Sequence, residues 1–383
     1  VVFWLILKWD EHADEEGSDK WLILIAYLMG LSIGVHLLNL LTIPAIVLVY
    51  YFRRHDFSWT GVCGAFGVSV AILAAILYGI IPGVPTIAGW FELLFINTLG
   101  FPFNTGLVIY LLLMAAALVW AIWETYKAIN DKNTINTRTI ISFVTAMTFA
   151  GVPFIKESVK FGILLIVATL ILLFVMKKVV SARWLNTITM MVTVIIIGYA
   201  SYAAIVIRSA AETPMDQNSP DNVFSLKYYL NREQYGDNPL FYGPTFIAPI
   251  PKEQINGRVV EGEPDFSNPV MPIKRDKNAN PIEIKGQAQY AKAPREEGKP
   301  DRYEITGHKM EYEYESKHKM LFPRMYSGQS HHAEAYKEWA DIKGKRVSYT
   351  DYGYNRKNEF ESFTAKGVMP TFAENLRFFF RYQ

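Results

Sequence analysis

The composition of the chain changes abruptly near Arg208. Before this residue the sequence is a succession of long apolar runs, and after it the sequence is polar and rich in Tyr and Pro. Only the first part contains runs of roughly 20 apolar residues, the length that a helix needs to cross a bilayer. We therefore expect residues 1–208 to form a transmembrane helical region and residues 209–383 to form an extracytoplasmic soluble domain.

About six of the apolar runs are predicted to be full spans. Because a backbone in lipid must satisfy its own hydrogen bonds, these runs are expected to be helices. Val1–Leu7 reads as the tail of a further span, so the chain is interpreted as an internal piece of a longer protein. The predicted full spans are Trp21–Tyr51, Trp59–Ile81, Thr105–Trp123, Thr139–Ile155, Phe161–Met176 and Trp184–Ile207.

The distribution of charge predicts an orientation, because Lys and Arg favour cytoplasmic loops. The loop over residues 8–20 is acidic, and the stretch 81–104, which is rich in Pro and Gly, carries only Glu92 as a charged residue. These loops are expected on the outer side, together with residues 209–383, and the basic loops in the cytoplasm. The basic residues are Arg53, Arg54, Lys127, Lys132, Arg138, Lys177, Lys178 and Arg183.

Several classes of function find no support in the sequence. A net charge of +2 gives no electrostatic reason to expect nucleic acid as a partner. Cys63 is the single cysteine, so neither an intramolecular disulfide nor a cysteine-based metal site can form within the chain. The spacing of His331, His332 and Glu334 matches no closed zinc site and is typical of a solvated helix start, so a divalent metal is not supported by the sequence.

The polar half is expected to fold as a mixed α+β domain. Tyr303–Glu315 alternates apolar and acidic residues as a strand does, and residues 252–302 have the composition of a long loop with short strands. Helices are predicted over Phe224–Arg232, His331–Ile342 and Ala373–Tyr382. The last of these carries an aromatic cluster beside Arg377 and Arg381, which suits a membrane interface, and the chain is expected to re-enter the bilayer soon after Gln383.

Polar residues within the apolar half are candidates for a site. His36 and Asn39 are spaced to share one helix face, where they could bind a donor or form interhelical hydrogen bonds. Glu92, in a short interfacial helix, could bind a substrate or a metal, or could simply point to water. Arg208 could hold the phosphate of a lipid-linked donor by bidentate hydrogen bonds, or could anchor the last span at the interface.

A second candidate lies just beyond the last predicted span. The segment 231–237 combines a cation, carboxylates, amides and an aromatic ring, a mixture that suits recognition of a sugar or a peptide. It could equally be a helix C-terminus, with Gly236 supplying the left-handed turn. The candidate binding residues are Asn231, Arg232, Glu233, Tyr235 and Asp237.

Several stretches of the chain form long motifs: Gly30-Leu-Ser-Ile-Gly-Val-His-Leu-Leu-Asn-Leu-Leu41, Phe101-Pro-Phe-Asn104, Gly198-Tyr-Ala-Ser-Tyr202, Ile207-Arg-Ser209, Tyr229-Leu-Asn-Arg-Glu-Gln-Tyr-Gly-Asp237, His332-Ala-Glu-Ala-Tyr-Lys-Glu-Trp339 and Phe378-Phe-Phe-Arg-Tyr-Gln383. These motifs resemble one family of multi-spanning proteins of the bacterial inner membrane, the protein O-mannosyltransferase-like group within the GT-C glycosyltransferases. The resemblance extends over nearly the whole chain and implies a GT-C-like helical fold with a periplasmic domain.

The resemblance implies a polyprenyl-phosphate-linked sugar as donor and a Ser or Thr of an exported protein as acceptor, with the bilayer as the surrounding solvent. In such enzymes an acidic residue in the first extracytoplasmic loop acts as general base. The Trp-Asp-x-Gly-Glu type of segment expected to carry it is absent here, so the catalytic residue stays unassigned and is transferred neither to Asp10 nor to Glu92. The alternative function is a non-catalytic membrane scaffold, or a subunit of an envelope complex that docks a partner.

Overall fold

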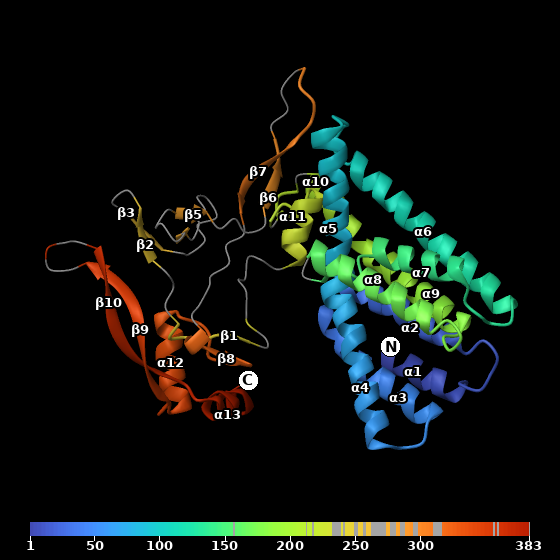
Figure 1. Ribbon diagram of the computed structural model, residues 1–383, viewed down its shortest axis with the longest axis horizontal. Helices are drawn as coiled ribbons and strands as arrows, with labels where there is room; N and C mark the ends of the chain where they lie inside the picture. The colour runs from blue at the N-terminus through green and yellow to red at the C-terminus, as the bar shows by residue number, and fades with distance from the viewer. Residues whose placement is uncertain are drawn as a thin grey trace. The chain divides into compact units, whose positions relative to one another are not determined.

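A computed structural model gives the fold of the chain (Figure 1). The chain divides into two compact units, Val1–Gln234 with Ala291–Glu304, and Tyr235–Tyr290 with Ile305–Gln383. This division follows packing, whereas the boundary at Ser209 follows composition, and the assignment of residues 209–383 to water stays a prediction. The structure describes residues 1–155, 158–211, 213–216, 218–231, 239, 242–248, 252–255, 258–261, 273–275, 281–283, 288–293, 298–308, 316–354, 357 and 360–382.

The first unit consists mainly of helices. Its helical segments are α1 (Val2–Glu11), α2 (Asp19–Ile33), η1 (Leu37–Thr42), α3 (Ile43–Arg54), α4 (Trp59–Ala74), η2 (Ala75–Ile80), α5 (Ile81–Glu92), η3 (Leu93–Thr98), α6 (Thr105–Asn130), α7 (Thr137–Phe149), α8 (Val159–Val175), α9 (Ala182–Tyr199), η5 (Ala200–Tyr202), α10 (Ala203–Ala210) and α11 (Val223–Leu230). It also contains Ala291–Glu304, the part of the β6–β7 hairpin that includes the connection between the two strands. The strands are β6 (Ala288–Lys292) and β7 (Tyr303–His308).

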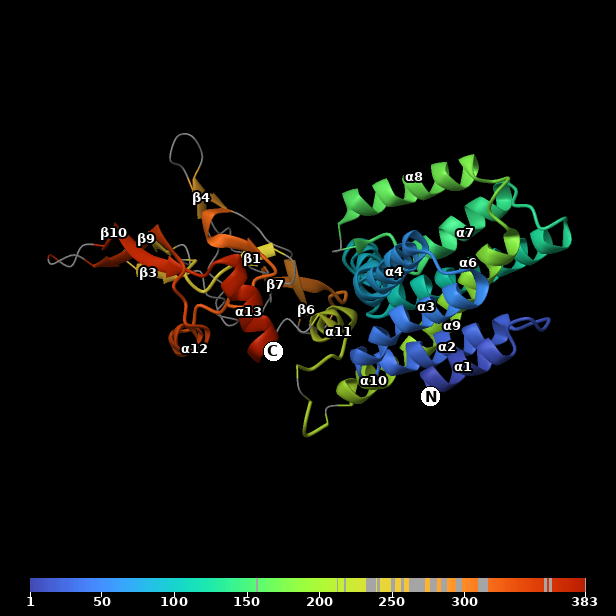
Figure 2. The same cartoon turned by 90° about the horizontal axis from the view of Figure 1, so that it is seen from below.

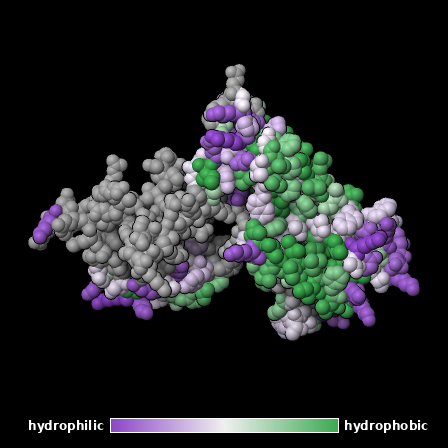
Figure 3. Space-filling model, turned by 45° about the horizontal axis from the view of Figure 1, so that its top comes forward, coloured by the Kyte–Doolittle hydropathy of each residue, from purple (hydrophilic) through white to green (hydrophobic). Residues whose placement is uncertain are grey.

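The apolar helices make this chain a membrane protein. Within the described residues, four helical stretches are long and apolar enough to cross a bilayer: Leu37–Arg54, Trp59–Thr98, Thr105–Asn130 and Ala182–Ala210. Hydrophobic residues cover the visible face of these helices, and hydrophilic residues gather at the loops beyond them (Figure 3). The predicted spans beginning at Thr105 and Trp184 are thus confirmed as long helices, and that of Phe161–Met176 as the shorter apolar helix α8.

The predicted span Trp21–Tyr51 is wrong as a single helix. Helix α2 ends at Ile33, and the chain turns through an extended His36 before η1 and α3 begin. Tertiary hydrogen bonds stabilise this break: the Tyr202 hydroxyl donates to the Ile33 carbonyl at 2.9 Å, and Asn39 Nδ2 donates to Ser32 Oγ at 3.0 Å. The apolar composition on both sides of the turn is the same, which is why the sequence alone suggested one span.

This hairpin corrects the predicted position of the acidic loop. Arg53 forms ion pairs with Asp10 and Asp14, and Arg54 donates to the Ala13 carbonyl at 2.6 Å. Because α3 returns toward the start of α2, the acidic loop lies at the same end of the helices as the basic residues. We call this the acidic-loop end.

The other basic loops also lie at the acidic-loop end. Thr187 in α9 lies 3.5 Å from Asp19 (Oγ1 to Oδ2), and Asn133, after α6, donates from its Nδ2 to Ser181 Oγ at 3.2 Å. Helices α6 and α7 run in opposite directions, since the Tyr110 hydroxyl donates to the Phe149 carbonyl. The helix predicted over Thr139–Ile155 therefore exists, although it ends at Phe149.

The opposite end of the first unit carries α10 and α11 (Figure 2). We call it the α11 end. Because α9 starts beside Asp19 and continues through η5 into α10, residues beyond Ala210 emerge at this end. The basic loops and the residues that directly follow α10 thus lie at opposite ends of the helices of the first unit.

The Pro- and Gly-rich stretch after Ile81 is helical, which corrects its prediction as a loop. The chain stays helical from Trp59 to Thr98, with π-helical turns at Ala75–Ile80 and Leu93–Thr98. Pro85 has no N–H to donate to the carbonyl of Ile81, but the Tyr199 hydroxyl donates to this carbonyl at 3.0 Å. A neighbouring helix therefore satisfies the backbone group that the proline leaves open.

In the described residues of the second unit, antiparallel strand pairs accompany the helices α12 and α13. Its core comprises Phe246, Met325, Ala340 and Phe378, against which Tyr336 packs. The predicted helices near residues 331 and 373 are confirmed, while of the predicted strand 303–315 the described part is β7. The elements are β1 (Tyr242–Pro244), β2 (Lys252–Ile255), β3 (Arg258–Glu261), β4 (Ile273–Arg275), β5 (Pro281–Glu283), η7 (Ser316–His318), β8 (Lys319–Leu321), α12 (Ser330–Ala340), β9 (Lys345–Tyr354), β10 (Phe360–Met369) and α13 (Phe372–Tyr382).

Glu374 joins α13 to the turn before β9. Its carboxylate accepts hydrogen bonds from the backbone N–H groups of Lys343, Gly344 and Thr371, at 2.8–3.0 Å, and from the Thr371 hydroxyl. Partial burial acts to raise the pKa of Glu374, but these hydrogen bonds outweigh it and hold the pKa below its usual value. The ionised carboxylate is thus the form that closes this turn.

We expect the closure by Glu374 to depend on pH. Its folded-state pKa is lowered, so the stabilisation is present above the unfolded-state pKa of about 4.3 and disappears as the pH falls through the folded-state value. Hydrogen exchange at the Lys343 and Gly344 amides, corrected for intrinsic rates, should lose protection over this range. Glu374→Gln should lose most of the protection at neutral pH and show little further pH dependence; an unchanged pH profile in this variant would contradict the assignment.

Candidate functional site

The α11 end of the first unit gathers elements that are distant in the sequence. Helix α11 packs against α5, and a Cβ added to Gly89 of α5 would lie 2.9 Å from the Phe224 ring of α11. The inner part of the β6–β7 hairpin belongs to the same unit. We call the polar residues at this junction the α11-end cluster: Glu92, Asn97, Asp221, Lys292, Asp301 and Tyr303.

Hydrogen bonds between side chains and backbone groups hold the hairpin against the end of the helical stretch Trp59–Thr98. The Asn97 amide pairs with Tyr303 twice: Nδ2 donates to the Tyr303 carbonyl at 2.9 Å, and the Tyr303 N–H donates to Oδ1 at 2.8 Å. In addition, the Phe103 N–H donates to Asp301 Oδ2 at 3.1 Å. These contacts define the register between hairpin and helix without any strand pairing.

Tyr303 is the aromatic centre of the junction. Its side chain is buried, and its ring meets Phe103 and Phe224 edge to face, with centroid distances of 5.0 and 4.9 Å. The hydroxyl has no hydrogen-bond partner among the described residues. Burial, together with nearby carboxylates, raises the pKa of Tyr303 far above its usual value, so the hydroxyl is a buried donor at every physiological pH.

Glu92 is buried in the same junction, with an exposed fraction of 1%, which corrects the expectation that it points to water. Its Oε1 accepts a hydrogen bond from the Leu107 N–H in the first turn of α6 at 3.1 Å. A carboxylate is favourable there because the first N–H groups of a helix have no partner within the helix. Its Oε2 has no partner among the described residues, so only one oxygen of the carboxylate accepts a hydrogen bond from an N–H group of α6.

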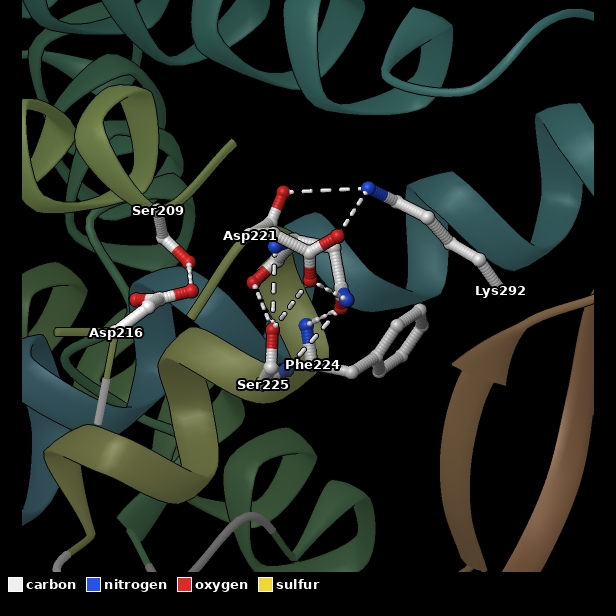
Figure 4. Close-up of polar contacts among 7 residues, drawn as sticks. Ser209, Asp216, Asp221, Phe224, Ser225 and Lys292 are labelled. Atoms are coloured by element: carbon white, nitrogen blue, oxygen red, sulfur yellow. Dashed lines mark hydrogen bonds and ion pairs between the residues drawn. The ribbon is translucent and has the colours of Figure 1, made fainter. Parts of the chain in front are cut away.

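An ion pair links the hairpin to the start of α11 (Figure 4). Lys292 Nζ lies 2.7 Å from Asp221 Oδ2, and Asp221 also accepts hydrogen bonds from the side chains of Asn222 and Ser225. Burial acts to raise the pKa of Asp221, but Lys292 and these hydrogen bonds bring it below its usual value. Asn222 and Ser225 form a capping box, which explains why α11 begins at Val223.

A further hydrogen bond orders the segment that joins α10 to α11. The buried Ser209 hydroxyl donates to Asp216 Oδ2 at 2.7 Å, as Figure 4 shows. The backbone that leaves the last apolar helix is thus tied down within a few residues of the helix end.

The predicted pairing of His36 and Asn39 on one helix face is wrong. His36 has extended backbone angles, is exposed, and accepts the Leu38 N–H on its Nδ1 at 3.1 Å, while Asn39 lies in η1 and donates to Ser32. His36 thus caps a short helix, and Asn39 makes a hydrogen bond within the hairpin of α2 and α3. Both follow the end of α2 at Ile33, whose carbonyl accepts the Tyr202 hydroxyl, and so lie at the α11 end.

The remaining predicted site residues are only partly described. Arg208 is exposed in the last turn of α10, and Asn231 follows the last residue of α11. The convergence of Arg208 and Asn231 with His36 and Asn39 on one cavity stays a prediction. Arg232, Glu233, Tyr235 and Asp237 lie outside the described residues.

The α11-end cluster was not found from the sequence. Of its members, only Glu92 is a candidate site residue on the basis of the sequence. Asn97 and Tyr303 are 206 residues apart, and nothing in their local sequence signals a partner. In the part of the chain that the structure describes, no three His, Cys, Asp or Glu side chains gather as a metal site would require.

Fold and charge distribution together define a polytopic helical membrane protein. Residues 1–59 match the family described as the protein O-mannosyl-transferase TMEM260 N-terminal domain, and residues 236–380 match a family of unknown function, DUF8416. The first match supports an O-mannosyltransferase-like family. Neither a curated protein nor a solved structure matches the chain.

Proposed function

We propose that the chain is the membrane-embedded part of a glycosyltransferase with a GT-C fold in the bacterial inner membrane. It moves a sugar from a polyprenyl-phosphate donor to Ser or Thr of exported proteins at the outer face, with residues 209–383 in the periplasm. The observation that carries this proposal is the match of residues 1–59 to the N-terminal domain of a protein O-mannosyl-transferase. The long apolar helices are consistent with a donor that is itself a membrane lipid.

The orientation of the helices supports transfer at the α11 end. Lys and Arg in short loops favour the cytoplasmic side irrespective of nearby carboxylates, and these loops lie at the acidic-loop end. The α11 end then faces outward, where a lipid-linked donor and an exported acceptor can meet. Arg208, exposed at this end, is the residue that we expect to hold the donor phosphate.

A sugar-transfer assay on the full-length protein in membranes tests the proposal. Radiolabelled polyprenyl-phosphate sugars and an exported acceptor protein are supplied to wild type, Arg208→Ala and Arg138→Ala. Losing charge-assisted hydrogen bonds costs about 1.5–3 kcal/mol, so Arg208→Ala should transfer at least roughly tenfold more slowly. Arg138 is likewise exposed, but at the acidic-loop end, and its variant should retain wild-type activity.

The possible results distinguish the proposed sugar transfer from the proposed role of Arg208 as a phosphate ligand. No transfer by wild type from any of the donors would overturn the proposed function. Transfer that is equally fast in both Arg variants would keep the function and reject Arg208 as a phosphate ligand. Size-exclusion chromatography of each variant in detergent shows whether a loss of activity reflects misfolding.

A further inference from the structure

Helix α13 has one face in the core of the second unit and another that this unit leaves uncovered. Phe378 is buried and meets Tyr336 edge to face at 5.5 Å. On the other side, Phe380 is 79% exposed and stands between the exposed Arg377 and Arg381. A largely exposed aromatic ring between two guanidinium groups has the composition of a membrane-interface anchor.

The uncovered face of α13 is cationic. Glu374 is the single carboxylate of the helix, and its oxygens accept four hydrogen bonds at the first turn. It is therefore directed toward the turn before β9 and does not neutralise Arg377 and Arg381 in the later turns. Within the part of the chain that the structure describes, this face thus combines apolar surface with positive charge that no carboxylate of α13 neutralises.

Further apolar side chains adjoin this helix. Asn375 fixes the neighbouring segment, since its Nδ2 donates to the Phe322 carbonyl at 2.7 Å and its Oδ1 accepts the Arg324 N–H at 2.8 Å. Phe322 is 42% exposed, and Leu321 is 56% exposed opposite an equally exposed Tyr242. Hydrophobic and hydrophilic residues accordingly lie next to each other along the lower edge of this unit in Figure 3.

We propose that this face, which we call the α13 face, docks on anionic lipid headgroups of the bilayer that the first unit spans. Aromatic rings settle at headgroup depth, and Arg side chains can lay their apolar stems along the interface while their charge meets lipid phosphate. The bilayer is always available, because the two units are parts of one chain and the first is embedded in it. The inference does not depend on sugar transfer.

Spin labelling of the full chain in nanodiscs tests this docking. Cys63 is the only cysteine, so Cys63→Ser provides a background in which Phe380→Cys receives a single nitroxide. Lys337→Cys, exposed on α12 of the same unit, is the matched control. The measurement compares how often the nitroxide collides with oxygen, which concentrates in lipid, and with a nickel chelate, which stays in water. Discs contain either phosphatidylglycerol with phosphatidylcholine or phosphatidylcholine alone.

We expect the label at position 380 to prefer oxygen in the anionic discs and the label at 337 to prefer the chelate. The preference at 380 should fall to that of the control in phosphatidylcholine discs and in an Arg377→Glu, Arg381→Glu variant. Equal accessibility at both positions in anionic discs would overturn the proposal. So would spin–spin broadening at 380, because it would place a second copy of the chain on this face.

Discussion

Replacing Gly30 by Leu should prevent the helices of the first unit from packing. A Cβ at this position would lie 2.4 Å from the carbonyl oxygen and 2.8 Å from the Cα of Ile195 in α9. The obstacle is backbone, which cannot rotate away, and Gly198 of α9 is in the same position against Leu31 and Gly30. Helices in lipid associate largely through such close contacts of small residues. We expect the free energy of unfolding to fall by about 3 kcal/mol or more, which is the upper end of the cost of overpacking a protein interior.

The loss is measured by heating the detergent-solubilised protein and following the fraction that remains monodisperse. The midpoint should fall by roughly 5 °C or more for Gly30→Leu. Gly64→Leu is the control, since a Cβ at Gly64 in α4 meets nothing within 4 Å. Similar midpoints for the two variants would mean that α2 and α9 do not approach as closely as described.

This interface illustrates what the sequence could and could not predict. Continuous apolar runs identified the helices that begin near Thr105 and Ala182, because composition and length suffice for that inference. The turn at His36 could not be identified in this way, since the residues on both sides are equally apolar. It depends on the hydrogen bond that the Tyr202 hydroxyl donates to the carbonyl of Ile33, 169 residues earlier in the chain.

The interpretations of Pro82, Pro85 and Glu92 were wrong for a related reason. Pro82 and Pro85 predicted a loop because proline removes a backbone donor, yet Tyr199 and the π-helical turns keep the chain helical. Glu92 predicted a solvated side chain because its charge is costly to bury, yet the unpaired N–H of Leu107 provides a partner. In both cases a residue from another element reverses the local preference. The candidate site is built from such contacts, which is why most of it was missed.

Replacing Tyr303 by Ala should detach the β6–β7 hairpin from the α11 end. The ring is 3% exposed between Phe103 and Phe224, and deleting a large buried aromatic side chain costs about 3–5 kcal/mol. The contacts of the hairpin with Asn97, Phe103 and Asp221 remain in this variant, so we expect the loss to appear as local opening of the hairpin rather than global unfolding. Cleavage by trypsin after the exposed Arg302, which no proline follows, should become much faster in native membranes.

Tyr303→Phe is the matched control, since it keeps the ring and removes only the hydroxyl. That hydroxyl has no partner among the described residues, and removing a buried donor without an acceptor should be neutral or stabilising by up to about 1 kcal/mol. Cleavage after Arg302 should therefore be no faster than in wild type. If Tyr303→Phe instead opened the hairpin as readily as Tyr303→Ala, the hydroxyl would have a partner in the membrane-bound protein. Its position beside the half-satisfied Glu92 would then make the α11-end cluster a ligand site rather than an anchor.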